Sequence, residues 1–447
     1  MKNHSKNFKQ KQLASGLSNF LFFKRNIFLF IGILFSIKQA NAQSPIYYIT
    51  ADKVFDGEQM HANWAVIIKA NKIIAAAPKE KLAKPADAIA VHYPGSTLTP
   101  GLIEGHSHML LYPYNKTTWD DQVTKETDAY RTARATIHVK KTLLAGFTTA
   151  RDLGSEGAGY ADVSIKKAIE DGVIPGPRLL VAGRAIVATG SYGPKGYDLD
   201  QHIMLGAEEA DGNNLIKVTR DQIGKGADLI KVYADYRWGL NGEAAPTFTL
   251  DELKKINEVT RSSGRVMVAH AKTNEAMQRA ILAGAATIEH GDLLDEATAE
   301  LMKQKGTVYF PTLAATESVT QYKGWKKGSE PEPEAIKQKR NAFSIAMAKG
   351  VTIGMGGDVG VFEHGNNVLE MELMQQYGMP ALQVLKAATS VNARALRMQD
   401  QIGFIKPGHF ADLVIFSGDP SQNISALRNP LWIMKDGVVY PTENSKN

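Results

Sequence analysis

Between residues 99 and 400, short apolar runs alternate with stretches of helical character, and this alternation constrains the fold more than any other feature. Stretches typical of helices include residues 251–262 and 274–283. Such alternation is typical of βαβ units and a parallel sheet. About 260 residues for eight units fits a (β/α)8 TIM barrel, which usually takes ~250 residues. We expect strands at residues 102–105, 148–152, 179–182, 229–233, 266–270, 287–290, 308–311 and 352–358.

The two ends of the chain are rich in short β-like runs separated by turns. Such runs lie at residues 66–69 and 72–74, and again at 411–416 and 431–440. Their pattern predicts one small β-sandwich domain formed by both termini. The expected organisation is a signal peptide at 1–42, the first part of the β-sandwich at 43–98, the barrel at 99–400 and the second part of the β-sandwich at 401–447.

Residues 1–42 have the pattern of a secretory signal peptide. A basic, polar segment precedes the apolar run at 27–35, and Ala40-Asn41-Ala42 forms a small-x-small cleavage site. Cleavage after Ala42 would start the mature chain at Gln43. The run is shorter than the ~20 residues that a membrane span needs, although an uncleaved anchor is the alternative. We therefore expect a periplasmic or secreted protein whose mature form has no membrane span.

The formal net charge of +6 does not indicate a nucleic-acid partner. Seven basic side chains and no acidic ones lie in residues 1–42, so the remainder of the chain is close to neutral. The chain contains no cysteine. Any metal ion must therefore be held by histidine, carboxylate or modified lysine side chains.

Several expected strands end in a residue that can bind a metal ion. His106 and His108 are alternate residues of the first strand, so both imidazoles can reach one ion. His270 and His290 end the fifth and sixth strands. Each histidine taken alone is more often a hydrogen-bonded core residue than a ligand.

Asp358 and Lys231 are weaker candidates with common structural alternatives. Asp358 follows glycines that lack the spacing of a phosphate-binding loop, and an aspartate there could cap the next helix. Lys231 lies within an apolar run, where a lysine usually extends its amine to solvent. Buried beside metal ions, that amine could instead react with CO2 to give a carbamate, an anionic bridging ligand.

The order of these six residues along the chain resembles that of the amidohydrolase superfamily. Residues 99–108 (TPGLIEGHSH) resemble its opening motif. Residues 145–154, 287–291 and 405–413 are similar to the subgroup called imidazolonepropionase-like, and the likeness covers nearly all of residues 46–440. Members of this subgroup with the lysine are similar to Xaa-Pro dipeptidases and related metallo-carboxypeptidases.

The resemblance implies two divalent metal ions, for which zinc is the first expectation. His106, His108 and Asp358 would bind the more buried ion, and His270 and His290 the second. Lys231, as N6-carboxylysine, would bridge the two. A hydroxide shared by both ions would be the nucleophile, and Asp358 would move its proton to the leaving amine.

The resemblance is weaker at the positions expected to contact the substrate. Dipeptidase members usually carry a tyrosine two residues after the histidine of the fifth strand, where this chain has Lys272, and a histidine where it has Tyr192. Lys272 could pair with a substrate carboxylate, and Tyr192 could donate a hydrogen bond. Arg237 and His364 are further candidates for substrate contact, although a solvated loop arginine is the more common case.

Three functions are compatible with these residues. The first is hydrolysis of the amide C–N bond of a dipeptide or an N-acyl amino acid. The second is hydrolysis of a cyclic amide or a related small heterocycle. The third, a catalytically silent metal-binding or ligand-binding protein of the cell envelope, is disfavoured by the intact ligand set. A homo-oligomer is compatible with the sequence.

Overall fold

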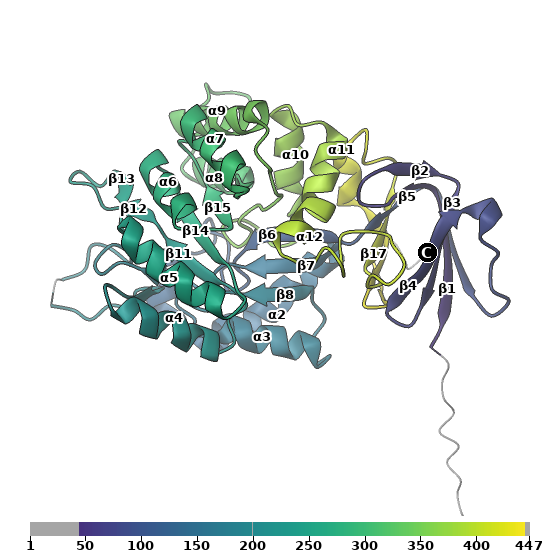
Figure 1. Cartoon of the computed structure of the whole chain (residues 1–447), viewed down its shortest axis with the longest axis horizontal. Coiled ribbons are helices and arrows are strands. Elements are labelled where there is room, and N and C mark those ends of the chain that lie inside the picture. The colour runs from purple at the N-terminus through teal and green to yellow at the C-terminus, as the bar shows by residue number, and fades with distance from the viewer. Residues whose placement is uncertain (1–43, 199, 443–447) are drawn as a thin grey trace, which may run out of the picture. The chain divides into compact units, whose positions relative to one another are not determined.

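The computed structural model describes residues 44–198 and 200–442 (Figure 1). The expected signal peptide and its cleavage site lie outside these residues. In the described part of the chain, no helix combines the length and the apolar character that a membrane crossing requires.

Strands from both ends of the chain form one mixed sheet. The strand β5 joins them, because it pairs with β1 in parallel and with β17 antiparallel. The sequence predicted a β-sandwich, but the structure has a single sheet here, since the 12-residue β5 is long enough to pair with strands from both termini. The order is β19 (Val438–Tyr440), β18 (Pro430–Lys435), β17 (Leu413–Ser417), β5 (Ile89–Pro100), β1 (Ile46–Phe55), β3 (Trp64–Lys69) and β4 (Lys72–Pro78), with β2 (Met60–Ala62) on β1.

The middle of the chain contributes parallel strands, as the alternation predicts. One sheet has the order β6-β7-β8 and another the order β10-β9-β11-β14-β15-β16. The expected runs from 102 to 311 each overlap one of these strands. The bounds are β6 (Leu102–Ser107), β7 (Phe147–Asp152), β8 (Arg178–Val181), β9 (Ile186–Val187), β10 (Glu208–Glu209), β11 (Ile230–Tyr233), β14 (Met267–Ala271), β15 (Thr287–His290) and β16 (Val308–Phe310).

The run at 352–358 forms isolated bridges in place of the expected strand. Its backbone bonds to β16 on one side, with Gly354 N donating to Tyr309 O at 2.9 Å, and to β6 on the other, with Asp358 N donating to His106 O at 2.9 Å. A Cβ on Gly356 would lie 2.9 Å from atoms of His106. The glycines therefore allow this segment to pack between β16 and β6, and it carries Asp358 to the end of β6.

Helices lie between most of the parallel strands, and α5, α6 and α7 flank β14 and β15 (Figure 1). Helix α5 begins with a capping box between Thr249 and Glu252, which satisfies two free backbone N–H groups. A short hairpin, β12 (Asp235–Arg237) and β13 (Ala244–Pro246), follows β11. The helices are α1 (Trp119–Lys125), α2 (Asp128–Leu144), α3 (Ala161–Glu170), α4 (Asn214–Gly224), α5 (Leu250–Ser262), α6 (Asn274–Leu282), α7 (Glu296–Lys305), α8 (Leu313–Tyr322), α9 (Glu334–Lys349), α10 (Val368–Gln376), α11 (Ala381–Lys386) and α12 (Asn392–Ala395).

Candidate metal centre and active site

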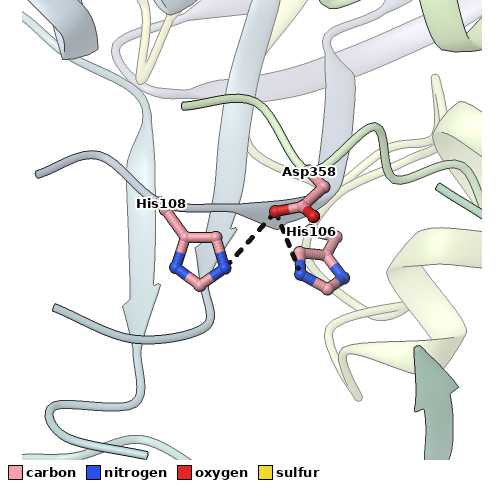
Figure 2. Close-up of side chains that lie close together, drawn as sticks. All are labelled: His106, His108 and Asp358. Carbon is pink, nitrogen blue, oxygen red and sulfur yellow. Dashed lines mark ion pairs between the residues drawn. The ribbon is translucent and has the colours of Figure 1, made fainter. Parts of the chain in front are cut away.

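His106, His108 and Asp358 form a buried group at the end of β6 (Figure 2). One potential ligand atom from each lies within 4.8 Å of the others. Asp358 Oδ1 is 3.5 Å from His106 Nε2 and 3.4 Å from His108 Nε2. Neither His106 Nε2 nor Asp358 Oδ1 has a hydrogen-bond partner among the described residues. Buried polar atoms are rarely left unpaired, so the group has the features of a metal site.

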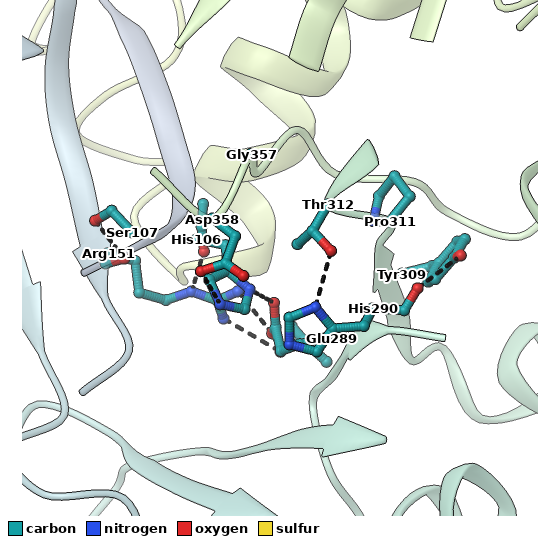
Figure 3. Close-up of polar contacts among 12 residues, drawn as sticks. His106, Ser107, Arg151, Glu289, His290, Tyr309, Pro311, Thr312, Gly357 and Asp358 are labelled. Carbon is teal, nitrogen blue, oxygen red and sulfur yellow. Dashed lines mark hydrogen bonds and ion pairs between the residues drawn. The ribbon is translucent and has the colours of Figure 1, made fainter. Parts of the chain in front are cut away.

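The orientation of both imidazoles is fixed from behind. His106 Nδ1 donates to Glu289 Oε2 at 2.8 Å, and His108 Nδ1 donates to the carbonyl oxygen of Gly154 at 2.9 Å. Glu289 also accepts from Arg151 Nη2 at 2.9 Å (Figure 3). Burial alone would raise the pKa of Glu289, but Arg151 and His106 lower it to about 2. A fixed anion at Nδ1 leaves Nε2 of His106 free to bind a metal ion.

His290 and His270 extend this group along the ends of β15 and β14. The ring centroids of His106 and His290 are 5.0 Å apart, and those of His290 and His270 are 4.4 Å apart. His290 Nδ1 forms a hydrogen bond of 2.8 Å with Thr312 Oγ1 (Figure 3). His270 Nε2 is buried and has no hydrogen-bond partner among the described residues.

Burial keeps these imidazoles neutral, which is the form that binds metals. It lowers the pKa of His106 to about 4, although Asp358 acts in the opposite direction. It also lowers the pKa of both His270 and His290, and neighbouring positive groups add to this effect. Unpaired imidazole nitrogens that stay neutral at pH 7 fit divalent metal ions.

Lys231 lies on β11 and is 1% exposed. No described residue accepts a hydrogen bond from its amine, which lies 5.6 Å from the ring centroid of Tyr233. Burial lowers the pKa of Lys231 to about 8, while Glu289 and Asp358 partly oppose this shift. Part of its population is therefore the neutral amine near neutral pH, the form that reacts with CO2.

The four residues expected to contact the substrate lie in different surroundings. Lys272 Nζ lies 3.2 Å from Asp292 Oδ2, close to the end of β14. Tyr192 is buried and donates to Glu156 Oε2 at 2.6 Å. Arg237 is exposed on β12, and His364 lines a separate cavity of about 260 Å³ together with His138.

Besides Glu289, two further carboxylates near the metal-site residues were not identified from the sequence. Glu156 accepts hydrogen bonds from Trp119 at 2.8 Å, Tyr192 at 2.6 Å and Tyr233 at 3.1 Å, and lies 3.8 Å from His108 Nδ1. Asp235 lies 3.6 Å from His270 Nε2. Glu156 lies four residues after the end of β7 and Asp235 two residues after the end of β11, and a carboxylate just after a strand end was the available signal.

A family profile and a curated relative both match more than half of the chain. A profile described as "Amidohydrolase family" matches residues 97–439. Ochratoxinase from Aspergillus niger is 30% identical over 309 residues. That alignment covers 64% of this chain and 63% of ochratoxinase, less than two thirds of the relative's length.

Solved structures cover more of the chain. A Xaa-Pro dipeptidase with methionine in its active site is 29% identical with a TM-score of 0.77, covering 88% of this chain and 99% of that one. A prolidase complexed with N-methylphosphonate-L-proline is 26% identical with a TM-score of 0.77, covering 89% and 100%. The crystal structure of ochratoxinase is 25% identical with a TM-score of 0.76, covering 90% and 96%.

Proposed function

Because the chain belongs to the amidohydrolase family, we propose that it hydrolyses the amide C–N bond of a dipeptide or an N-acyl amino acid. The observation that carries this proposal is the buried group of His106, His108 and Asp358, in which His106 Nε2 and Asp358 Oδ1 lack a hydrogen-bond partner among the described residues. The similarity to a Xaa-Pro dipeptidase and a prolidase supports a substrate with an amide bond next to a carboxylate.

We propose that the site holds two divalent metal ions. His106, His108 and Asp358 would hold the first ion, and His270 and His290 the second. Lys231, as a carbamate, would bridge them. A ligand set of nitrogen and oxygen atoms without sulfur suits zinc. When bound, the ions would lower the pKa of the attacking water and polarise the scissile carbonyl.

The chain's own residues would move the proton and orient the substrate. The Asp358 carboxylate would take a proton from the attacking water and deliver it to the leaving amine nitrogen. Lys272, whose side chain is 42% exposed, would bind the substrate carboxylate. Tyr192 would lie along the substrate, held in place by Glu156.

We also propose that the parallel strands close a (β/α)8 barrel. Asp228 N donates to Val181 O at 2.8 Å between β8 and β11, and the run at 352–358 bonds to both β16 and β6. In such barrels the catalytic groups lie at the C-terminal ends of the strands, as His270 and His290 do here. The barrel would span residues 99–400.

We further propose that the protein acts in the periplasm or outside the cell after cleavage behind Ala42. The basic and apolar pattern of residues 1–42 supports export. N-terminal sequencing of the exported protein tests this directly. A mature chain that still begins at Met1 would contradict it.

Metal analysis combined with a substrate screen tests the proposed chemistry. Protein purified without chelators should contain about two equivalents of zinc or a similar ion, and Lys231→Ala should contain clearly less. The metal-loaded wild type should release the amine product from dipeptides or N-acyl amino acids. A protein that opens only cyclic amides would contradict the proposed substrate, and one equivalent unaffected by Lys231→Ala would contradict the bridged pair.

A further inference from the structure

Lys339 is a buried lysine of helix α9 that contacts the ends of β15 and β16. Its side chain is 1% exposed. Its amine donates to the carbonyl oxygens of His290 at 2.9 Å and Pro311 at 2.7 Å, and to Asp292 Oδ1. A buried ammonium is costly unless it is paired and hydrogen-bonded. Because all three protons have acceptors, Lys339 is a fixed positive charge that no substrate can reach.

Asp292 holds two ammonium groups, one on each oxygen. Its Oδ1 binds Lys339, and its Oδ2 lies 3.2 Å from Lys272 Nζ. The side chain of Lys272 is 42% exposed, so a ligand can approach it. Among the described residues, Asp292 provides the one carboxylate within 4.0 Å of the Lys272 amine. Lys272 therefore shares its partner with a second cation.

Lys272 and Asp292 each lie two residues after an expected metal ligand. Lys272 follows His270, and Asp292 follows His290. The backbone N of Lys272 donates to Asp235 Oδ2 at 2.8 Å, which fixes the start of its side chain. The shared carboxylate and its exposed ammonium thus lie beside the proposed metal centre.

We propose that Lys339 is a positioning residue for substrate specificity, because it occupies Asp292 Oδ1 and leaves the Lys272 ammonium available to a substrate carboxylate. The inference rests on the proposed function and names the carboxylate as the substrate group that the site selects. Without Lys339, Asp292 would have Lys272 as its single cationic partner. That closed pair would compete with the substrate carboxylate for Lys272.

The test compares kcat/KM for a dipeptide with a free C-terminal carboxylate and for the same dipeptide as its C-terminal carboxamide. The ratio of the two values does not depend on the fraction of folded, metal-loaded enzyme. In Lys339→Met we expect this ratio to fall at least tenfold, mainly through KM of the carboxylate substrate. In Lys339→Met/Asp292→Asn, which lacks the competing carboxylate, the ratio should return towards that of the wild type.

Two further variants complete the design. Lys349→Met makes the same change at the C-terminal end of α9, where Lys349 pairs with Glu296, and should leave the ratio unchanged. Asp292→Asn alone keeps the contacts of Lys339 to the two carbonyl oxygens. It should give a ratio equal to or above that of the wild type, and it tests the inference even if Lys339→Met does not fold.

The outcomes separate this inference from the proposed function. A wild type that prefers the carboxylate substrate, with an unchanged ratio in Lys339→Met, overturns the inference and leaves the proposed function intact. A ratio that falls in Lys339→Met but does not recover in the double variant shows a purely structural role and also overturns it. A wild type that hydrolyses both dipeptides without preferring the carboxylate overturns the inference alone, and a wild type that hydrolyses neither overturns both.

Discussion

Asp358 occupies a left-handed backbone conformation, with a φ of 64°, while its Oδ1 faces two imidazoles. His290 and Thr312, which hydrogen-bond to each other, are also left-handed, with φ of 75° and 50°. Such conformations cost about 1–3 kcal/mol for residues other than glycine. Strain at three positions around one group of ligands indicates that the fold gives up stability to aim these side chains.

Asp358→Asn separates metal binding from proton transfer. The amide retains an oxygen that can bind a metal ion, but it cannot accept and return a proton at neutral pH. We expect the variant to fold and bind metal, and to lose at least a thousandfold in kcat, on the order of 4 kcal/mol of transition-state stabilisation. Metal analysis and steady-state kinetics on one preparation measure both properties. Near-normal turnover would contradict the role of Asp358.

Glu289→Gln tests the support behind His106. The change removes the anion that binds both His106 Nδ1 and Arg151, so the imidazole loses its orienting charge and Arg151 keeps an uncompensated one. Loss of such a partner typically weakens metal binding about 10–100-fold. Competition with a chelator measures this affinity. Glu275→Gln, which removes an exposed ion pair with Arg279, is the control, and equal affinities in the two variants would contradict the prediction.

At the scale of elements, the sequence predicts the strands better than their connections. Runs such as 266–270 and 287–290 combine apolar residues with a terminal histidine, so both the strand and the ligand are readable. The run at 352–358 also combines apolar residues with a terminal metal-binding residue, here Asp358. Its pairing, however, depends on contacts with β6 and β16, which a local sequence pattern does not contain. Glu156 and Tyr192 are 36 residues apart in the sequence. Their contact follows from the packing of loops, so a local pattern does not predict it either.

Gly356→Ala tests the close packing of that segment. A Cβ at this position would lie 2.9 Å from His106 N, His106 Cβ and Phe310 Cδ1, so either the segment or His106 must move. Overpacking of this kind costs about 1–3 kcal/mol. We expect Tm to fall by several degrees and the metal content to decrease. Gly224→Ala in helix α4, where an added Cβ meets nothing within 4 Å, is the control and should lower neither quantity.

At the scale of the whole molecule, the fold buries carboxyl groups away from the metal ligands as well as beside them. Burial raises the pKa of Glu370 to about 8 and that of Glu104 to about 7, although both accept hydrogen bonds from backbone N–H groups. The alternation of strands and helices predicts the parallel strands from the sequence. It does not predict the burial of Glu370, because a glutamate in a helix such as α10 is usually exposed.

Glu370→Gln should therefore change how stability depends on pH. A folded pKa of about 8 lies above the ordinary value of 4.5, so the protonated acid stabilises the fold. This contribution is complete below pH 4.5 and is lost as the pH rises through 8. Glutamine resembles the protonated acid and can still accept from Ala314 N, which lies 2.7 Å from Glu370 Oε2.

We expect wild type and Glu370→Gln to have similar Tm values at about pH 5, and the variant to be more stable by several degrees at about pH 9. Thermal unfolding across this range measures the difference, and loss of metal affects both proteins alike. Glu372 lies on the same helix as Glu370, and Glu372→Gln removes its more accessible ion pair with Arg428. The Tm difference between this variant and the wild type should therefore stay small at both pH values. Parallel curves for wild type and Glu370→Gln would show that Glu370 is ionised in the folded protein and would contradict the prediction.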